Sequence, residues 1–225
     1  MPERFHRREF ASLAELNAAL RDLVQESLQR ENAVPHAVML SGGRTPVPVY
    51  EAIAREPFPI AATAWITYTD DRHVPVENPH NNYWSSQPML EALQVPPERV
   101  IRVHPELSLE ESAQDFDKKL AGFFEQGGRI ALGLLGVGPD GHTCSLFDES
   151  DLERGKGRLA IPVYRPDGPD RVSVTLELLS KIERIIFMIA GSEKTDIARQ
   201  LYDSPETTIA GRAVRHCPQV EIWQA

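Results

Sequence analysis

Residues 130–147, IALGLLGVGPDGHTCSLF, decide the fold of this chain. The first six of them form an apolar run, which is typical of a strand buried on both faces. Residues 136–141 then form a turn, because three glycines tolerate positive φ and Pro139 fixes one φ. The polar residues that this turn brings to the carboxyl end of the strand are Asp140, His142, Thr143 and Ser145.

The position of His142 has two interpretations. In an open α/β sheet, ligands bind at the carboxyl ends of the strands, and a histidine there is a candidate general base because its pKa lies near cell pH. Alternatively, the segment is an ordinary strand-to-helix loop whose polar residues only cap a helix. This segment alone leaves both interpretations open.

Apolar runs alternate with amphipathic segments along the rest of the chain. Strands are predicted at residues 37–40, 65–68, 100–103, 159–163, 171–176, 184–190 and 220–223. Helices are predicted at residues 12–30, 46–55, 108–124, 177–181 and 192–202, with Ser192 as the N-cap of the last. Asn82 is the expected cap of a further helix, which Pro88 should shorten or kink, and residues 148–157 and 165–170 are predicted as loops. The alternation predicts one α/β domain over residues 1–225, a Rossmann-like fold with a mainly parallel sheet flanked by helices.

Composition and charge argue against several classes of function. The 225 residues carry a net charge of −9, which argues against general nucleic-acid binding. No apolar run approaches the length of a membrane span, and the basic start MPERFHRREF has no apolar core behind it, so neither a membrane anchor nor a signal peptide is expected. Two cysteines without a repeating spacing suit a reducing cytoplasm. An anionic substrate would need a local cluster of donors that overcomes the overall negative charge.

Residues 41–46, SGGRTP, form a second glycine-rich turn, between a strand and a helix. Thr45 is the expected N-cap of the helix, and Pro46 suits its first turn. A helix N-terminus at a strand end offers backbone N–H groups and a positive dipole to a phosphate. The motif is neither a Walker loop nor GxGxxG, so no nucleotide cofactor is implied. Glycine in such a turn also has a purely steric explanation.

Charged residues follow two further strands. Asp70, Asp71 and Arg72 come after the strand at 65–68. They are either a surface salt-bridge cluster, or Arg72 holds a substrate anion and a carboxylate orients it. Lys194 lies in the first turn of the helix after the strand at 184–190, where the helix dipole disfavours a cation. A bound phosphate would explain a lysine at that position.

Four segments of the chain match one family pattern, in order. They are LSGGRTP (40–46), W-x4-DDRHVP with the following NN (65–82), GVGPDGHTCSLF (136–147) and RVSVTL…GSEK (171–194). The sequence resembles the 6-phosphogluconolactonases, for which the third segment is highly specific, whereas SGGxTP is shared with the glucosamine-6-phosphate deaminases. The chain departs from the family pattern at Asp71, where glutamate is usual, at Asn81, where serine is common, and at Asp148, where proline is usual.

The resemblance implies hydrolysis of 6-phospho-D-glucono-1,5-lactone to 6-phosphogluconate in the oxidative pentose phosphate pathway, without metal or cofactor. It also implies a fold of the sugar-phosphate isomerase/deaminase type. In this interpretation His142 takes the proton from water, Asp140 orients the loop or the lactone ring, and Arg72 stabilises the developing negative charge. The expected substrate- and phosphate-binding residues are Ser41, Gly42, Gly43, Arg44, Thr45, Asp70, Arg171 and Lys194. The expected partner is the small sugar-phosphate lactone, with no nucleic acid and no membrane, and the protein is expected as a monomer or weak homodimer.

Other chemistries fit these residues less well. Cys144 lies two residues from His142, but neighbouring turn positions rarely point together and nothing else marks an activated thiol. The candidate metal ligands His36, His73, His80, His104 and His142 are scattered, without the HxxxH or CxxC spacing of a metal site. An amino-sugar-phosphate deaminase or isomerase would share the SGGxTP turn and DGH, but the continuation TCSLF favours a lactonase. A non-catalytic sugar-phosphate sensor would be expected to lack His142 or Arg72, and both are present.

Overall fold

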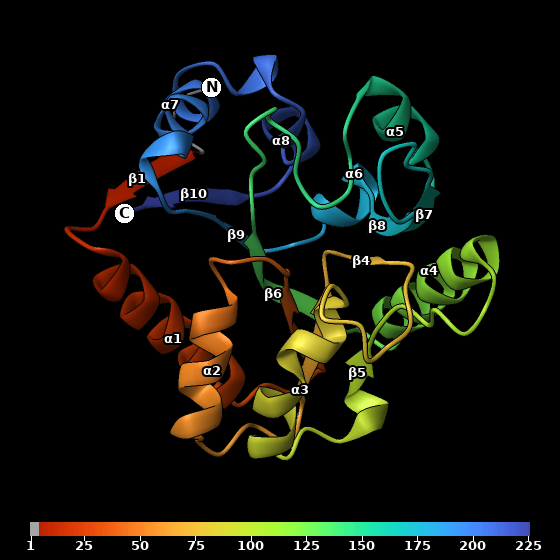
Figure 1. Cartoon of the computed structure of the whole chain (residues 1–225). Helices are drawn as coiled ribbons and strands as arrows, with labels where there is room; N and C mark the ends of the chain where they lie inside the picture. The colour runs from red at the N-terminus through yellow and green to blue at the C-terminus, as the bar shows by residue number, and fades with distance from the viewer. Residues whose placement is uncertain (1–4) are drawn as a thin grey trace.

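The computed structural model describes residues 5–225 and contains a seven-stranded central sheet (Figure 1). Its strands are, in spatial order, β1 (Phe5–Glu9), β10 (Gln219–Gln224), β9 (Arg184–Ile189), β6 (Arg129–Leu135), β2 (His36–Leu40), β3 (Ala64–Tyr68) and β5 (Val100–Ile101). Every neighbouring pair is parallel. The predicted α/β fold with a mainly parallel sheet is therefore confirmed.

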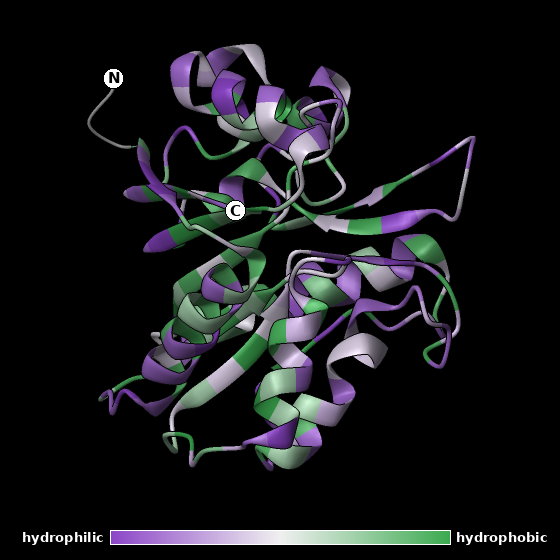
Figure 2. Cartoon of the chain, turned by 60° about the vertical axis from the view of Figure 1, so that its left-hand side comes forward, coloured by the Kyte–Doolittle hydropathy of each residue, from purple (hydrophilic) through white to green (hydrophobic). Residues whose placement is uncertain are grey.

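The sheet is covered on both faces, which explains why its central strands are apolar on both sides. One hydrophobic cluster joins Leu132 and Leu134 of β6 to helices α1 (Leu13–Gln29), α2 (Val47–Arg55) and α3 (Asn82–Ala92). A second cluster joins Ile130 and Leu135 to helices α4 (Leu109–Glu125), α5 (Glu149–Arg154), α6 (Leu176–Leu179), α7 (Thr195–Asp203) and α8 (Ile209–Ala213). Figure 2 shows the apolar strands between layers of helices that carry hydrophilic residues.

A second, antiparallel sheet contains three strands, β4 (Asp70–Arg72), β8 (Arg171–Val174) and β7 (Ala160–Val163), in that order. Only Thr69 separates β3 from β4, so the small sheet begins where a strand of the main sheet ends. The register places Arg72 opposite Arg171. The sequence did not predict β4, because three polar residues carry no strand pattern.

The prediction of an exposed loop at residues 148–157 is wrong, because this segment contains α5. Asp148 is its N-cap and accepts a hydrogen bond from Asp151 N at 3.0 Å. Aspartate is a strongly preferred N-cap, so the residue that departs from the family pattern begins a helix here. Asp151 in turn accepts a hydrogen bond from Phe147 N at 2.8 Å and fixes the end of the His142 loop.

Three predicted helix caps are also wrong. Thr45 does not cap α2, because Pro46 stands at the N-cap position and makes no side-chain capping bond. Asn81, and not Asn82, caps α3 by accepting a hydrogen bond from Trp84 N at 2.9 Å. Ser192 makes no capping hydrogen bond, because a 3-10 turn, Ser192–Lys194, precedes α7.

Other differences concern elements with weak sequence signals. Helix α3 continues through Pro88 to Ala92. Strand β1 was not predicted because it is a polar edge strand, and α8 was not predicted because it has only five residues. The expected absence of a signal peptide was based on residues 1–10, of which the first four lie outside the described residues. Within residues 5–225, no helix has both the length and the apolar character needed to cross a bilayer.

Candidate active site

A pocket of about 540 Å³ opens at the carboxyl ends of strands β2, β3 and β6, next to the small sheet. The structure brings these predicted site residues together as its lining: Ser41, Gly42, Asp70, Arg72, Asp140, His142, Arg171 and Lys194. Gly43, Arg44 and Thr45 belong to the turn after β2 but are not among the lining residues. The volume is in the range of sites for small organic ligands.

His142 is held by a tight hydrogen-bonded loop. Gly138 N donates to His142 O at 2.8 Å, and His142 Nδ1 lies 2.5 Å from Asp140 Oδ1. Glycine is required at 138, because a Cβ there would lie 2.2 Å from His142 Nδ1. Burial alone would raise the pKa of Asp140, but the hydrogen bonds and charge of His142 outweigh it and lower that pKa. The ionised carboxylate therefore accepts a hydrogen bond from Nδ1–H, which leaves Nε2 as the nitrogen that can take up a proton.

Phe147 contacts the imidazole of His142, with ring centroids 4.5 Å apart and ring planes inclined at 42°. The guanidinium of Arg165 lies over the same phenyl ring, with its Cζ 3.8 Å from the centroid. Both residues line the pocket, and the sequence analysis assigned neither to the site. The available signal was the phenylalanine that ends the TCSLF segment; Arg165 stands in a loop without a local motif.

Asp70 joins the His142 loop to the small sheet. Its Oδ2 accepts a hydrogen bond from Ser145 Oγ at 2.5 Å, and its Oδ1 accepts one from Thr69 Oγ1 at 2.7 Å. Ser145 N also donates to Ser173 Oγ on β8 at 3.1 Å. Because Asp70 is only 6% exposed and both its carboxylate oxygens are engaged, it anchors the site and is not free to act as a base.

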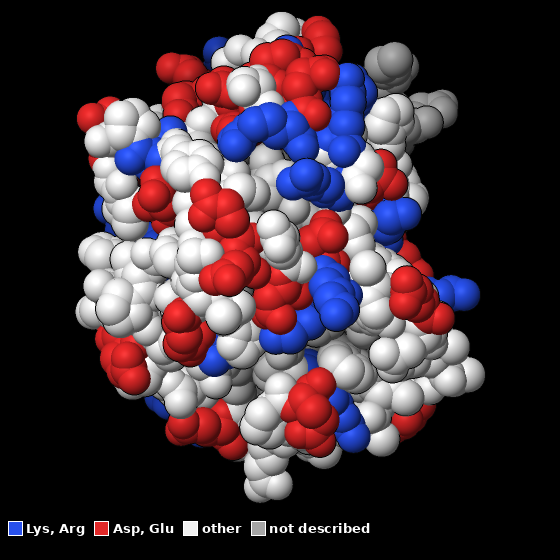
Figure 3. Space-filling model, turned by 90° about the vertical axis from the view of Figure 1, so that its right-hand side faces the viewer, with Lys and Arg blue, Asp and Glu red and all other residues white. Residues whose placement is uncertain are grey.

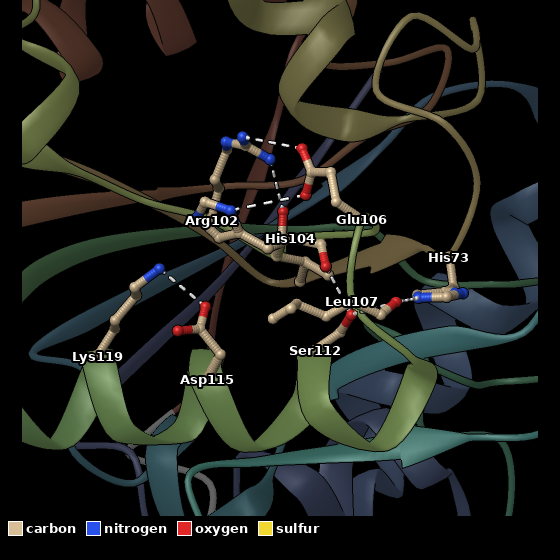
Figure 4. Close-up of polar contacts among 9 residues, drawn as sticks. His73, Arg102, His104, Glu106, Leu107, Ser112, Asp115 and Lys119 are labelled. Atoms are coloured by element: carbon tan, nitrogen blue, oxygen red, sulfur yellow. Dashed lines mark hydrogen bonds and ion pairs between the residues drawn. The ribbon is translucent and has the colours of Figure 1, made fainter.

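Arg72 enters the pocket with one edge of its guanidinium group fixed. Its Nη1 donates to His80 O at 2.9 Å and to Asn82 Oδ1 at 3.1 Å. Its Nε is buried and has no acceptor among residues 5–225. The next residue, His73, fixes the start of the following loop, because its Nε2 lies 2.9 Å from Leu107 O (Figure 4). Within residues 5–225, Nη2 makes no hydrogen bond, so the end of the guanidinium that carries it remains for an anionic ligand.

Asp71 fixes the start of α3. Its Oδ1 accepts the backbone N–H groups of Arg72 and Asn82, both at 2.8 Å, and its Oδ2 accepts that of Tyr83 at 3.4 Å. Burial raises the pKa of Asp71 to about 7, and the charge of Asp70 adds to this, whereas the three N–H groups oppose it. Asp71 is not among the lining residues, so it acts on the pocket through the backbone of its neighbours.

The pocket concentrates positive charge in a chain whose net charge is −9. Arg72, Arg165, Arg171 and Lys194 line it. Burial and the charge of Arg72 lower the pKa of Arg171, although the charge of Asp70 opposes them. Burial also lowers the pKa of Lys194, against the charge of Glu193 and with a smaller contribution from Arg44. In the described part of the chain, no ion pair involves the four lining cations or Arg44.

Other basic side chains within residues 5–225 form ion pairs, as Arg184 does with Glu221 at 2.7 Å. On the face shown in Figure 3, acidic side chains are spread widely and basic ones lie among them. Three carboxylates, those of Asp70, Asp140 and Asp167, also line the pocket. The lining cations form no ion pairs with them, which favours an anionic ligand.

The turn after β2 reaches the pocket through Ser41 and Gly42. Tyr50 OH donates to Ser41 O at 2.8 Å and fixes the end of the strand. Ser41 Oγ is buried and has no partner among residues 5–225. Gly43 adopts a φ of +105°, a conformation that favours glycine. This geometry, a strand end followed by the N-terminus of α2, is that of an anion-binding turn.

The structure argues against a thiol nucleophile. Burial raises the pKa of the Cys144 thiol well above its usual value, and the charge of Asp70 raises it further. A thiol that stays protonated is a poor nucleophile. Within residues 5–225, no group of three or more histidine, cysteine, aspartate or glutamate side chains is arranged to hold a metal ion.

Residues 9–223 match the family described as "Glucosamine-6-phosphate isomerases/6-phosphogluconolactonase". The chain is 34% identical to the 6-phosphogluconolactonase of Homo sapiens over 215 residues, which cover 88% of this chain and 81% of the human one. It is 32% identical to that of Synechocystis sp. over 179 residues, which cover 75% and 72% of the two chains. The crystal structure of 6-phosphogluconolactonase from Thermotoga maritima matches with a TM-score of 0.75 at 25% identity, covering 98% of this chain and 99% of that one. The chain therefore belongs to the family of glucosamine-6-phosphate isomerases and 6-phosphogluconolactonases.

Proposed function

We propose that this protein is a 6-phosphogluconolactonase, which hydrolyses 6-phospho-D-glucono-1,5-lactone to 6-phosphogluconate in the oxidative pentose phosphate pathway. The observation that carries the proposal is the Asp140–His142 pair in the wall of a pocket whose lining also contains Arg72, Arg165, Arg171 and Lys194. Relatives of that name, similar to this chain over most of its length, support it. Both cysteines are free, which suits the reducing cytoplasm as its compartment.

In this proposal His142 acts as the general base. Its Nδ1 is engaged by Asp140, so Nε2 takes a proton from a water molecule while that water attacks the lactone carbonyl. The new C–O bond gives a tetrahedral oxyanion, whose collapse breaks the bond to the ring oxygen. The proton on His142 passes to the departing ring oxygen. The products are 6-phosphogluconate and one proton, and no covalent enzyme intermediate forms.

Arg72 stabilises the oxyanion with the edge of its guanidinium that the protein leaves free. A preorganised donor of this kind is worth about 10²–10³-fold in kcat. Asp70 holds the loop of His142 and the strand of Arg72 together through its bond with Ser145. The base and the oxyanion donor therefore keep a fixed relative position, as the reaction requires.

The phosphate binds at the turn formed by residues 41–45. Backbone N–H groups of this turn and the N-terminus of α2 favour an anion there. Lys194 and Arg171 supply positive charge from the other walls of the pocket. Arg44 does not line the pocket, but its charge is close enough to Lys194 to lower the pKa of that lysine.

The proposal is tested with freshly prepared 6-phosphogluconolactone in an assay coupled to oxidation of 6-phosphogluconate. Because a δ-lactone also hydrolyses unaided, the rate is compared with a blank that contains no enzyme. We expect a rate proportional to enzyme concentration and far above the blank. A rate equal to the blank would refute the proposal.

The same preparation is tested for release of ammonia from glucosamine 6-phosphate, because the family name also includes the isomerases. We expect none above background, since residues 143–147 continue the DGH segment as TCSLF. Ammonia release without lactone hydrolysis would assign the chain to the other branch of its family.

A further inference from the structure

Asn82 lies where the phosphate turn, Asp70 and Arg72 meet, and none of the catalytic steps uses it. We propose that Asn82 is a positioning residue, which fixes the guanidinium of Arg72 relative to the turn that binds the phosphate. The inference rests on the proposed lactonase function. It assigns Asn82 no contact with the reacting atoms.

Both polar ends of the Asn82 side chain are engaged by the protein. Its Nδ2 donates to Asp70 O at 2.8 Å, and its Oδ1 accepts from Arg72 Nη1 at 3.1 Å. The residue is 3% exposed, and its backbone N–H donates to Asp71 Oδ1 at 2.8 Å. Rotation of the side chain would break both side-chain bonds, so the amide holds Arg72 in one orientation.

The bond to Asn82 controls the whole guanidinium because that group is planar and rigid. Nη1 carries two N–H donors, and these are directed to His80 O and Asn82 Oδ1. His80 lies on an exposed loop, whereas Asn82 is buried at the start of α3. Of the two acceptors, Asn82 therefore has the more fixed position, and it determines where the free edge of Arg72 points.

Asn82 also touches the phosphate turn. A Cβ on Gly42 would lie 1.7 Å from Asn82 Oδ1 and 2.4 Å from Asn82 Cγ, and its three nearest heavy atoms would all belong to the Asn82 side chain. Gly42 is not among the glycines with positive φ, so its conformation does not require glycine. The close approach of Asn82 explains glycine at 42, and one amide thus sets the spacing between the turn and Arg72.

The first test compares Asn82→Ala with its neighbour Asn81→Ala. Without Asn82 the guanidinium of Arg72 is held at one point only, so kcat should fall by about 10–100-fold, with a smaller change in KM. Asn81 is also buried and caps α3, but its hydrogen bonds within residues 5–225 do not include Arg72, and the three heavy atoms nearest to a Cβ on Gly42 do not belong to it. Asn81→Ala should lower the melting temperature and leave kcat close to that of the wild type.

The second test uses Gly42→Ala alone and combined with Asn82→Ala. In the wild-type background the added methyl group displaces the amide of Asn82, so Gly42→Ala should lower kcat about as much as Asn82→Ala does. In the Asn82→Ala background the obstructing amide is gone, so the second substitution should cost less than about twofold. Losses that multiply would show that the turn at Gly42 and the amide of Asn82 act independently.

The outcomes separate this inference from the proposed function. A wild-type protein that does not hydrolyse the lactone refutes the function. If the wild type is active, the inference is overturned by an Asn82→Ala variant as active as Asn81→Ala, or by multiplicative losses in the double variant. If Asn82→Ala does not fold, Gly42→Ala decides alone: unchanged kcat in that folded variant overturns the inference, and a lowered kcat supports it.

Discussion

The two sheets contribute different groups to one pocket. The parallel sheet supplies turns at its strand ends: the turn after β2, the loop of His142 after β6, and the segment with Lys194 after β9. The antiparallel sheet supplies guanidinium groups, with Arg72 on β4 directly opposite Arg171 on β8. Proton transfer should therefore depend on the parallel sheet and stabilisation of the oxyanion on the antiparallel one. The phosphate site draws mainly on the parallel sheet, and Arg171 of β8 adds one cation from the antiparallel sheet.

The two contributions are also held in place differently. His142 is fixed by hydrogen bonds within one short loop, such as that from Gly138 N to His142 O. Arg72 is fixed by His80 and Asn82, which lie beyond the end of its own strand, in the following loop and at the start of α3. A group that depends on residues outside its own element is more easily misplaced by substitutions that never touch the ligand.

The largest effect is expected for His142→Ala, which tests whether the parallel sheet supplies the general base. Loss of the general base should lower kcat by about 10²–10⁴-fold with little change in KM. Steady-state kinetics with fresh lactone measure both constants. His216→Ala removes an exposed histidine that does not line the pocket and serves as the control. Wild-type kcat in His142→Ala would show that the parallel sheet does not supply the base.

The next largest effect is expected for Arg72→Ala, which tests whether the antiparallel sheet supplies the oxyanion donor. Loss of the oxyanion donor should lower kcat by about 10²–10³-fold. The control is Arg102→Ala, since Arg102 lies near the same loops but outside the pocket lining, paired with Glu106 at 3.5 Å (Figure 4). A rise in KM at constant kcat would instead show that Arg72 binds the ground state, and the two sheets would then share one role.

The sequence predicts the parallel half of the site better than the antiparallel half. Strands β2, β6 and β9 are apolar runs followed by glycine-containing turns, so both the strands and the polar residues after them are visible locally. The rule that ligands bind at the carboxyl ends of parallel strands then places His142, Ser41 and Lys194 at one edge. The structure brings these three residues into one pocket, as that rule requires.

The antiparallel half depends on contacts that no local pattern reveals. Strand β4 consists of two aspartates and an arginine, and it forms only because β8 pairs with it from a distant part of the chain. The position of Asn82 beside Gly42 follows from the same long-range arrangement, so the sequence indicated at most a helix cap. Arg165 joins the site through the ring of Phe147, a contact between two loops.

A smaller effect is expected for Lys194→Ala, which sharpens the division of roles within the parallel sheet. Removal of one cation from the phosphate site should raise KM about tenfold and leave kcat nearly unchanged. With D-glucono-1,5-lactone, which lacks the phosphate, the variant and the wild type should have the same kcat/KM. Lys181→Ala, in an exposed pair with Glu177 at 3.5 Å, is the control. Equal losses on both lactones would show that Lys194 does not recognise the phosphate.

The smallest effect on catalysis is expected at Asp71, which supports the antiparallel half without lining the pocket. Its substitution should instead change how the free energy of unfolding depends on pH. Burial raises the pKa of Asp71 to about 7 in the folded protein, whereas an aspartate in an unfolded chain titrates near about 3.9. Between these values the folded protein keeps a proton that the unfolded chain has lost. The contribution of Asp71 to the free energy of unfolding is therefore fully present below about pH 4 and is lost as the pH rises to about 7.

Asp71→Asn removes this titration and keeps an oxygen that can accept the N–H groups of Arg72 and Asn82. The free energy of unfolding of the variant, measured by urea denaturation, should depend less on pH than that of the wild type between about pH 4 and 7, by at most about 1.4 kcal/mol per pH unit. Identical pH dependence in both proteins would show that Asp71 is ionised throughout. Its charge, stabilised by the N–H groups at the start of α3, would then be a fixed part of the antiparallel half.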